Sequence, residues 1–176
     1  ANAQTLKIDR IISTLSMPHH AKCFTDSEGN ARVIAYCFRG QFAVLDPNDG
    51  NKVVGGWTNA DLLGSGYLAF ADPTGSYIWV SLRPSSGMDV SGGVAVVDVS
   101  NWRVVKRIAT EDKSPIWIEF TGDGKKVFVS NGHHSNIAEI TTDGPIPTWK
   151  LVRHTQAGTA GPYGLRLNWD ETQLWA

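Results

Sequence analysis

Five histidines are the residues of this sequence whose type and spacing most plainly suggest chemistry. Four of them form two adjacent pairs, His19–His20 and His133–His134, and the fifth is His154. A neutral imidazole binds transition metals, and its ordinary pKa of about 6.5 lets it exchange protons at physiological pH. The histidines therefore predict either a metal site, with His133 and His134 as candidate ligands, or a cationic site that handles protons.

Two arginines and two cysteines are the other candidates. Arg39 and Arg83 each follow a predicted strand, where a guanidinium group would attract an anion. Cys23 and Cys37 belong to one predicted hairpin, where they could face each other and form a disulfide in an oxidising compartment. Their spacing matches no thiolate zinc site. The sequence has no Cys-x-x-Cys-His motif, so this chain carries no covalently attached c-type haem.

The composition of the chain excludes several classes of protein. Its 176 residues include 41% hydrophobic and 19% charged residues, which supports a folded core and argues against disorder. The formal net charge of −1 leaves no broad basic surface, so a nucleic-acid partner is not expected. The apolar runs are strand-sized, as in Val94–Val97, and none reaches the length of a membrane span.

The elements that must position the candidate side chains are strands of a repeated unit. Each copy has a strand that ends at an Asp/Gly turn, a second strand, a third strand that ends near an acidic residue, and a short fourth strand. The three complete copies run through 21–29, 32–36 and 41–46; through 67–75, 77–81 and 93–98; and through 116–124, 126–130 and 136–140. Gly29, Gly75 and Gly124 recur at a period of about 47 residues. Four antiparallel strands at this period are typical of a β-propeller blade.

The predicted fold is therefore a single all-β domain, a β-propeller of four-stranded antiparallel blades with about four repeats; a β-sandwich is the alternative. The expected boundaries are the end of a preceding blade at 1–16, blades at 17–57, 58–110 and 111–153, and the first half of a last blade at 154–176. The terminal half-blades could close a four-bladed ring or belong to a ring of seven or eight blades. We expect the larger ring, completed by further blades or by a companion chain, because open strand edges need partners.

Connections between propeller strands alternate between two faces. One face holds the second-to-third and inter-blade connections and usually carries the binding groups. All five histidines are predicted there, with His154 in an inter-blade connection, together with Arg39 and Arg83. The acidic residues predicted to form turns on the opposite face, by bonding their own backbone, are Asp26, Asp72, Asp123 and Asp170. The aromatic residues predicted to fill the blade cores are Trp79, Trp117, Phe128 and Trp175.

These residues suggest a family. The run from Gly64 to Leu82, continued from Gly93 to Trp102, resembles the late blades of the haem d1 domain of periplasmic nitrite reductases. Met17-Pro-His19, followed by Phe24, is similar to the Pro-His that opens an earlier blade of that domain. The resemblance spans the chain as the carboxy-terminal half of an eight-bladed propeller. Residues 114–131 also resemble the repeat of secreted Tyr-Val-Thr-Asn-type propellers.

The resemblance implies a periplasmic or secreted protein that binds haem d1 and supports nitrogen-oxide redox chemistry with a redox partner. His19 would be the distal proton donor over the macrocycle, with His20, Arg39 and Arg83 beside it. The family's proximal histidine would lie outside this chain.

Two other interpretations of the function remain open. One is a non-catalytic secreted propeller that binds protein or cell-wall material through its loops. The other is a copper oxidoreductase, because the paired histidines are also similar to those of copper-carrying propellers such as nitrous oxide reductase and thiocyanate dehydrogenase. The sequence alone does not decide whether the chain is an enzyme.

Overall fold

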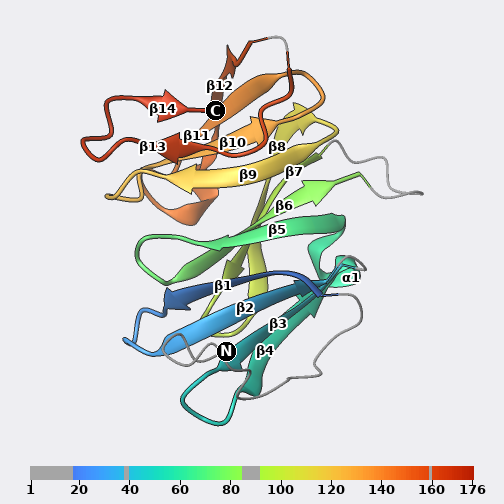
Figure 1. Ribbon diagram of the computed structural model, residues 1–176, viewed down its shortest axis with the longest axis vertical. Helices are drawn as coiled ribbons and strands as arrows, with labels where there is room; N and C mark the ends of the chain where they lie inside the picture. The colour runs from blue at the N-terminus through green and yellow to red at the C-terminus, as the bar shows by residue number, and fades with distance from the viewer. Residues whose placement is uncertain (1–17, 38–39, 85–91, 159) are drawn as a thin grey trace, which may run out of the picture.

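Strands account for nearly all of the regular structure of this protein. The computed structural model describes residues 18–37, 40–84, 92–158 and 160–176. They form three four-stranded sheets and one two-stranded sheet, all with antiparallel pairing (Figure 1). The strands of each four-stranded sheet lie in sequence order, as in a propeller blade. The predicted all-β propeller is therefore confirmed, as a partial propeller.

Two of the sequence predictions lie outside the described residues. These are the end of a preceding blade at 1–16 and the anion-attracting role of Arg39.

The four sheets follow one another along the chain. The first contains β1 (Pro18–Thr25), β2 (Ala31–Cys37), β3 (Gln41–Asp46) and β4 (Lys52–Thr58). The second contains β5 (Ser65–Ala71), β6 (Tyr77–Arg83), β7 (Gly92–Asp98) and β8 (Arg103–Asp112). The third contains β9 (Pro115–Phe120), β10 (Lys126–Asn131), β11 (Asn136–Thr141) and β12 (Lys150–Gln156), and the last contains β13 (Arg166–Leu167) and β14 (Leu174–Trp175).

Helices are a minor part of the fold. A single turn, α1 (Asn59–Leu62), joins the first two sheets, and a 3-10 turn at Ile146–Thr148 precedes β12. None of the helices described is long and apolar enough to cross a lipid bilayer.

The first strands of successive sheets lie in one row. β1 contacts β5, β5 contacts β9, and β9 contacts β13. Figure 1 shows β1, β5 and β9 side by side on the near side of the molecule. Because the first strand is the innermost strand of a propeller blade, this row marks the side of the central channel.

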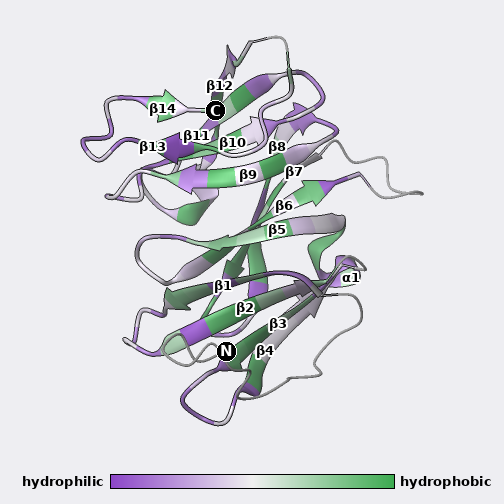
Figure 2. Cartoon of the chain, viewed as in Figure 1, coloured by the Kyte–Doolittle hydropathy of each residue, from purple (hydrophilic) through white to green (hydrophobic). Residues whose placement is uncertain are grey.

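The core lies between the sheets and is rich in stacked aromatic rings. Trp79 is 1% exposed, and its ring stacks on Trp149, which directly precedes β12 of the next sheet, with 5.7 Å between centroids. In the first sheet, Phe42 stacks on Trp57 at 5.2 Å. Figure 2 shows hydrophobic residues along the strands and hydrophilic residues in many of the turns between them. Burial of large rings on this scale holds neighbouring blades together.

The prediction of core aromatics is confirmed for Trp79, which belongs to the core, and for Trp117, which packs against it. It is wrong for Trp175, and Phe128 lines a cavity instead of packing against the core. Trp79 is buried, and Trp117 and Phe128 are half-buried. Trp175 is 65% exposed. In the described part of the chain β14 has no further strand beside it, so nothing covers this ring.

The register and the length of the strands correct two further predictions, on the cysteines and on His154. Cys23 is paired with Val33 and Cys37 with Pro18, so the two cysteines do not face each other, and both are free thiols. His154 lies inside β12 rather than in an inter-blade connection, because this strand continues to Gln156.

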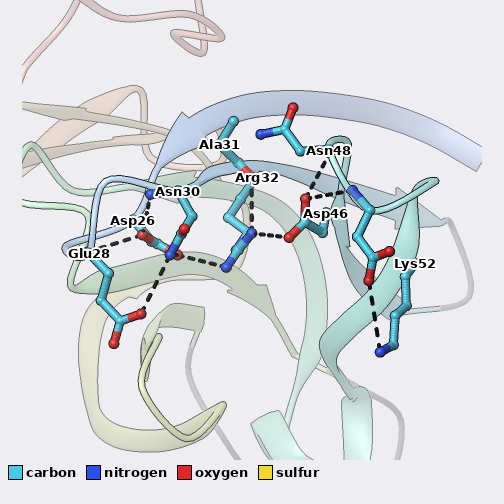
Figure 3. A network of polar contacts seen from close by, with 9 residues as sticks. Asp26, Glu28, Asn30, Ala31, Arg32, Asp46, Asn48 and Lys52 are labelled. Atoms are coloured by element: carbon cyan, nitrogen blue, oxygen red, sulfur yellow. Dashed lines mark hydrogen bonds and ion pairs between the residues drawn. The ribbon is translucent and has the colours of Figure 1, made fainter.

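The turn carboxylates were predicted correctly. Each bonds backbone N–H groups of its own turn: Asp26 with Asn30 at 2.8 Å, Asp72 with Tyr77 at 3.0 Å, Asp123 with Lys125 at 3.0 Å and Asp170 with Thr172 at 3.1 Å. We call this end of the blades the turn face. Figure 3 shows a polar network at this end, in which Arg32 joins Asp26 at 3.1 Å to Asp46 at 2.7 Å.

Candidate functional site

The candidate site lies at the opposite end of the blades, where first strands begin and second strands end; we call it the rim face. A β-bulge interrupts the pairing of the first and second strands there in all three four-stranded sheets. In the first sheet the extra residue is His19, between the pairs Pro18–Cys37 and His20–Tyr36. A bulge removes a residue from the ladder and redirects its side chain, and bulges are common beside binding sites.

Buried serines complete the bulges of the other two sheets. Ser81 Oγ accepts a hydrogen bond from the backbone N–H of Leu68 at 3.1 Å, and Ser130 Oγ accepts one from that of Trp117 at 2.9 Å. Both serines are fully buried. Their hydroxyl groups satisfy amides at the interrupted ladder, which fixes the backbone of the rim face.

His19 lies against two tyrosines. Its ring centroid is 5.8 Å from that of Tyr36, edge to face, and 6.1 Å from that of Tyr67. His19 is exposed, whereas Tyr36 is buried and Tyr67 is half-buried. The imidazole therefore rests on an aromatic surface and remains accessible from solvent.

Arg83, the last residue of β6, lies over the ring of Tyr67 with 3.6 Å between the guanidinium carbon and the ring centroid. This is a cation–π contact. Arg83 Nε is buried and makes no hydrogen bond within the described part of the chain. The hydroxyl of Tyr67 lies 3.2 Å from that of Tyr163, in the segment before β13. We call His19, Tyr36, Tyr67, Arg83 and Tyr163 the aromatic–cation cluster.

Two tyrosines of this cluster, Tyr36 and Tyr163, have raised pKa values. Burial and the nearby Tyr67 raise the pKa of Tyr36 to about 12. The hydrogen bond with Tyr67, followed by burial, raises the pKa of Tyr163. The Tyr36 hydroxyl donates a hydrogen bond to the carbonyl oxygen of Gly66 at 3.0 Å. The phenols of Tyr36 and Tyr163 are therefore neutral at physiological pH and do not neutralise the charge of Arg83.

His20 has a different environment from its neighbour His19. Its Nε2 atom is buried and has no hydrogen-bond partner among the residues described. Burial, then Lys22 and His19, lowers the pKa of His20, which favours the neutral imidazole. Of the four cofactor candidates, the structure brings His19 and Arg83 together through Tyr67.

The other histidine pair forms a second cluster around a buried carboxylate. Asp112, the last residue of β8, accepts hydrogen bonds from the backbone N–H groups of Ser114 at 2.6 Å and His134 at 2.8 Å. Asp112 Oδ2 lies 3.0 Å from His134 Nδ1. The ring centroids of His133 and His134 are 4.7 Å apart. We call Asp112, His133 and His134 the carboxylate–histidine cluster.

A cavity of about 410 Å³ opens on the channel side, between the first strands. Lys22 of β1 lines it, with its Nζ 3.9 Å from the ring centroid of Phe70 and 4.5 Å from that of Trp117. The pKa of Lys22 is lowered, chiefly by burial. The carboxylate of Glu119 opposes this shift, and the positive charge of Arg166 adds to it. The cavity therefore combines aromatic walls with two cationic side chains, Lys22 and Arg166, and two carboxylates, Asp72 and Glu119.

Sequence reasoning missed four residues of the two clusters. Tyr36, Tyr67 and Tyr163 carried a usable signal, since each falls at the rim end of a strand or in an inter-blade connection. Tyr36 occupies the repeat position of Ser81 and Ser130. Asp112 carried no such signal, because nothing in the local sequence links it to a loop 22 residues later.

Comparisons with known proteins identify the fold and no family. No family model and no curated protein matches the chain. Hydrazine synthase from Kuenenia stuttgartiensis has a similar structure, with a TM-score of 0.69 and 19% identity over 96% of this chain and 44% of that one. A putative 6-phosphogluconolactonase from Bacteroides uniformis ATCC 8492 gives a TM-score of 0.66 and 16% identity over 89% of this chain and 46% of that one.

A third similar structure is that of the dihydro-heme d1 dehydrogenase NirN, with a TM-score of 0.66 and 17% identity over 87% of this chain and 31% of that one. The chain thus spans less than half the length of these proteins. At such identities the likeness shows the β-propeller fold alone.

Proposed function

We propose that this chain is part of a propeller that binds a haem d1-type macrocycle at its rim face and supports nitrogen-oxide redox chemistry there. The observation that carries the proposal is the stacked pair of Arg83 and Tyr67 beside His19. A similar propeller, NirN, is named as a dehydrogenase of dihydro-heme d1.

The described residues fit such a group. Haem-type macrocycles present carboxylates at the edge of a flat apolar ring, and a guanidinium group is well suited to pair with a carboxylate. Arg83 Nε is a buried donor without a hydrogen-bond partner in the described part of the chain, and Tyr67 offers an aromatic surface beside it. Because an unsatisfied buried donor is costly, an anionic ligand at Arg83 would remove that cost.

The macrocycle and the side chains of this chain would then have separate roles. The bound macrocycle would supply the redox change, and the protein would supply orientation and protons. Reduction of nitrite to nitric oxide consumes one electron and two protons and releases water. The imidazole N–H of His19 would donate a proton to the oxygen that leaves nitrogen and recover it from solvent, to which His19 is exposed. Tyr36 and Tyr67 would hold the imidazole in place.

The ring would be completed by further blades, on a longer chain or a companion chain. The β13–β14 sheet has two strands, and Val152 on β12 of the preceding sheet is 52% exposed. Open strand edges and exposed apolar side chains favour association with another sheet. A native mass spectrum of the full-length protein would give the subunit number and the bound cofactor together. A stable monomer of this chain that forms a closed four-bladed ring would contradict this part of the proposal.

The experiment that tests the proposed function is a titration of the full-length protein with haem d1, followed by its absorption bands. We expect saturable binding that Arg83→Met weakens by roughly 10- to 100-fold, the range for loss of a charged hydrogen bond. The matched control is Arg103→Met, which removes an exposed arginine at the turn-face end of β8.

Two outcomes would overturn the proposal. One is the absence of saturable haem d1 binding, and the other is equal binding by the Arg83 and Arg103 variants. A copper signal in place of the haem bands would favour the copper reading, and the absence of both would favour a non-catalytic binding module. A periplasmic or secreted location is part of the proposal, and cell fractionation tests it.

A further inference from the structure

The carboxylate–histidine cluster on the rim face has no role in the proposed function. We propose that Asp112, His133 and His134 bind a divalent transition-metal ion, with Zn²⁺ as the reference ion. The donor atoms of the three side chains all lie within 4.8 Å of one another. The proposal goes beyond the macrocycle site and does not depend on it.

The fold brings the three residues together from two segments. Asp112 ends β8, whereas His133 and His134 lie in the connection between β10 and β11. β8 and β10 are in contact, and the backbone N–H of His134 is bonded to the Asp112 carboxylate at 2.8 Å. This bond fixes the histidine-bearing loop against the end of the neighbouring blade. The site is therefore positioned by backbone contacts, while the two imidazole rings remain exposed and adjustable.

The buried negative charge of Asp112 favours a bound cation. Its side chain is 0% exposed, and within the described ranges its only ion-pair partner is the half-exposed His134. Other buried carboxylates of this protein have a guanidinium partner, as Asp26 has in Arg32 at 3.1 Å. A buried charge without a fixed counter-charge is unfavourable, and a bound metal ion is one way to compensate for it. Asp112 is thus hydrogen-bonded by backbone N–H groups but, unlike the buried Asp26, has no guanidinium partner in the described ranges.

The donor set is appropriate for a transition metal. Two imidazole nitrogens and one carboxylate oxygen are ligands that Zn²⁺ accepts, with a fourth position left for water or another ligand. Ligand atoms around a tetrahedral zinc ion are about 3.3 Å apart, and the Asp112 Oδ2 to His134 Nδ1 separation is 3.0 Å. The His133 ring packs edge to face on that of His134 and is exposed, so a side-chain rotation can bring its nitrogen to the ion. A hard cation such as Mg²⁺ prefers oxygen ligands and should bind poorly here.

Calorimetric titration of the full-length protein with zinc chloride, in the absence of any macrocycle, tests this inference. We expect one Zn²⁺ per chain at this site and no comparable binding of Mg²⁺. His133→Ala is the informative variant, because the His133 side chain is exposed and the loop is held by the backbone N–H of His134. Loss of this ligand should weaken Zn²⁺ binding by about 100-fold. The thermal midpoint should rise with Zn²⁺ in the unmodified protein and much less in the variant.

His154→Gln is the matched control, since it removes an imidazole near the same cluster. His154 Nε2 lies 2.9 Å from the carbonyl oxygen of Thr110, and a glutamine amide can maintain a hydrogen bond there. This variant should bind Zn²⁺ as the unmodified protein does. Equal Zn²⁺ affinity in His133→Ala and His154→Gln would overturn the proposal, as would the absence of saturable Zn²⁺ binding. The His133–His134 pair would then be only an exposed loop held by Asp112.

Discussion

The turn face and the rim face of this protein are built from the same strands but differ in how their arginines are paired. On the turn face, Asp26 accepts backbone hydrogen bonds from Glu28 and Asn30 and pairs with Arg32, as Figure 3 shows. On the rim face, His20 Nε2 and Arg83 Nε are buried without a hydrogen-bond partner in the described part of the chain. Arg32 Nε on the turn face is likewise buried without a hydrogen-bond partner, so these nitrogens do not distinguish the faces. The difference is that Arg32 pairs with two carboxylates, whereas Arg83 lies over a tyrosine ring and has no ion pair among the described residues. In the proposed function, the paired arginine of the turn face stabilises a blade and the unpaired arginine of the rim face binds the ligand.

The two rim-face clusters differ in charge. The aromatic–cation cluster presents Arg83 on Tyr67 with neutral phenols around it, and so favours an anion. The carboxylate–histidine cluster is centred on the buried Asp112 and favours a cation. The two proposals therefore assign ligands of opposite charge to one face of the fold.

His19→Ala should have the largest effect. We expect nitrite turnover by the complete, cofactor-loaded protein to fall by about 10²- to 10⁴-fold, the usual cost of losing a proton donor. Stability should change little, because His19 is exposed. Steady-state kinetics and thermal unfolding of both proteins give the two numbers. Turnover at the rate of the unmodified protein would show that His19 is not the proton donor.

Arg32→Met should separate the faces in the other direction. It leaves the buried Asp26 carboxylate without its cation and should lower the thermal midpoint by about 5 °C. Binding of Zn²⁺ and of haem d1 at the rim face should be unchanged. The control is Lys52→Met, whose partner Asp49 lies 3.9 Å away with both side chains 70% exposed, so a shift below about 1 °C is expected. Similar decreases in the thermal midpoint of both variants would show that the ion pairs of Arg32 in Figure 3 stabilise the protein no more than an exposed pair does.

Tyr36→Phe should cost about 1 kcal/mol, the usual value of one hydrogen bond, here to the Gly66 carbonyl. The pH dependence is more specific. The pKa of Tyr36 is raised to about 12 from 10.0, so the unfolded chain loses its proton first as pH rises. The stability that Tyr36 contributes is thus present below pH 10 and declines between pH 10 and 12. Denaturant unfolding of both proteins should show their difference shrinking over that range, and a constant difference would contradict the buried state of Tyr36.

His20→Gln should have the smallest effect, confined to acid. Burial lowers the pKa of His20 below its ordinary value of 6.5, so the unfolded chain takes up a proton before the folded one does. The unmodified protein should therefore lose stability as pH falls below 6.5, and His20→Gln should lose less. Unfolding midpoints measured from pH 7 to pH 5 test this. Parallel curves would show that the ring of His20 is accessible to protons in the folded state.

Much of the scaffold was predictable because its causes are local. Alternating strands, Asp/Gly turns and a period of about 47 residues indicated the propeller, and carboxylates such as Asp72 bond only their own turn. The strand ends also placed His19 and Arg83 on one face. The exposed Trp175 was mispredicted because the alternation of a strand does not tell whether another sheet covers it.

By itself, the sequence determined the blade repeat, the turn chemistry and the face on which the histidines gather, since each follows from neighbours along the chain. Only the tertiary structure decided which residues meet. Tyr67 reaches Tyr163 across 96 residues, and Asp112 reaches His134 across 22. The strand register places Cys23 opposite Val33, and a bulge places His19 between two paired positions of the ladder. The physical reason is that bulges and inter-blade packing depend on how twisted sheets fit against one another, which no single strand encodes.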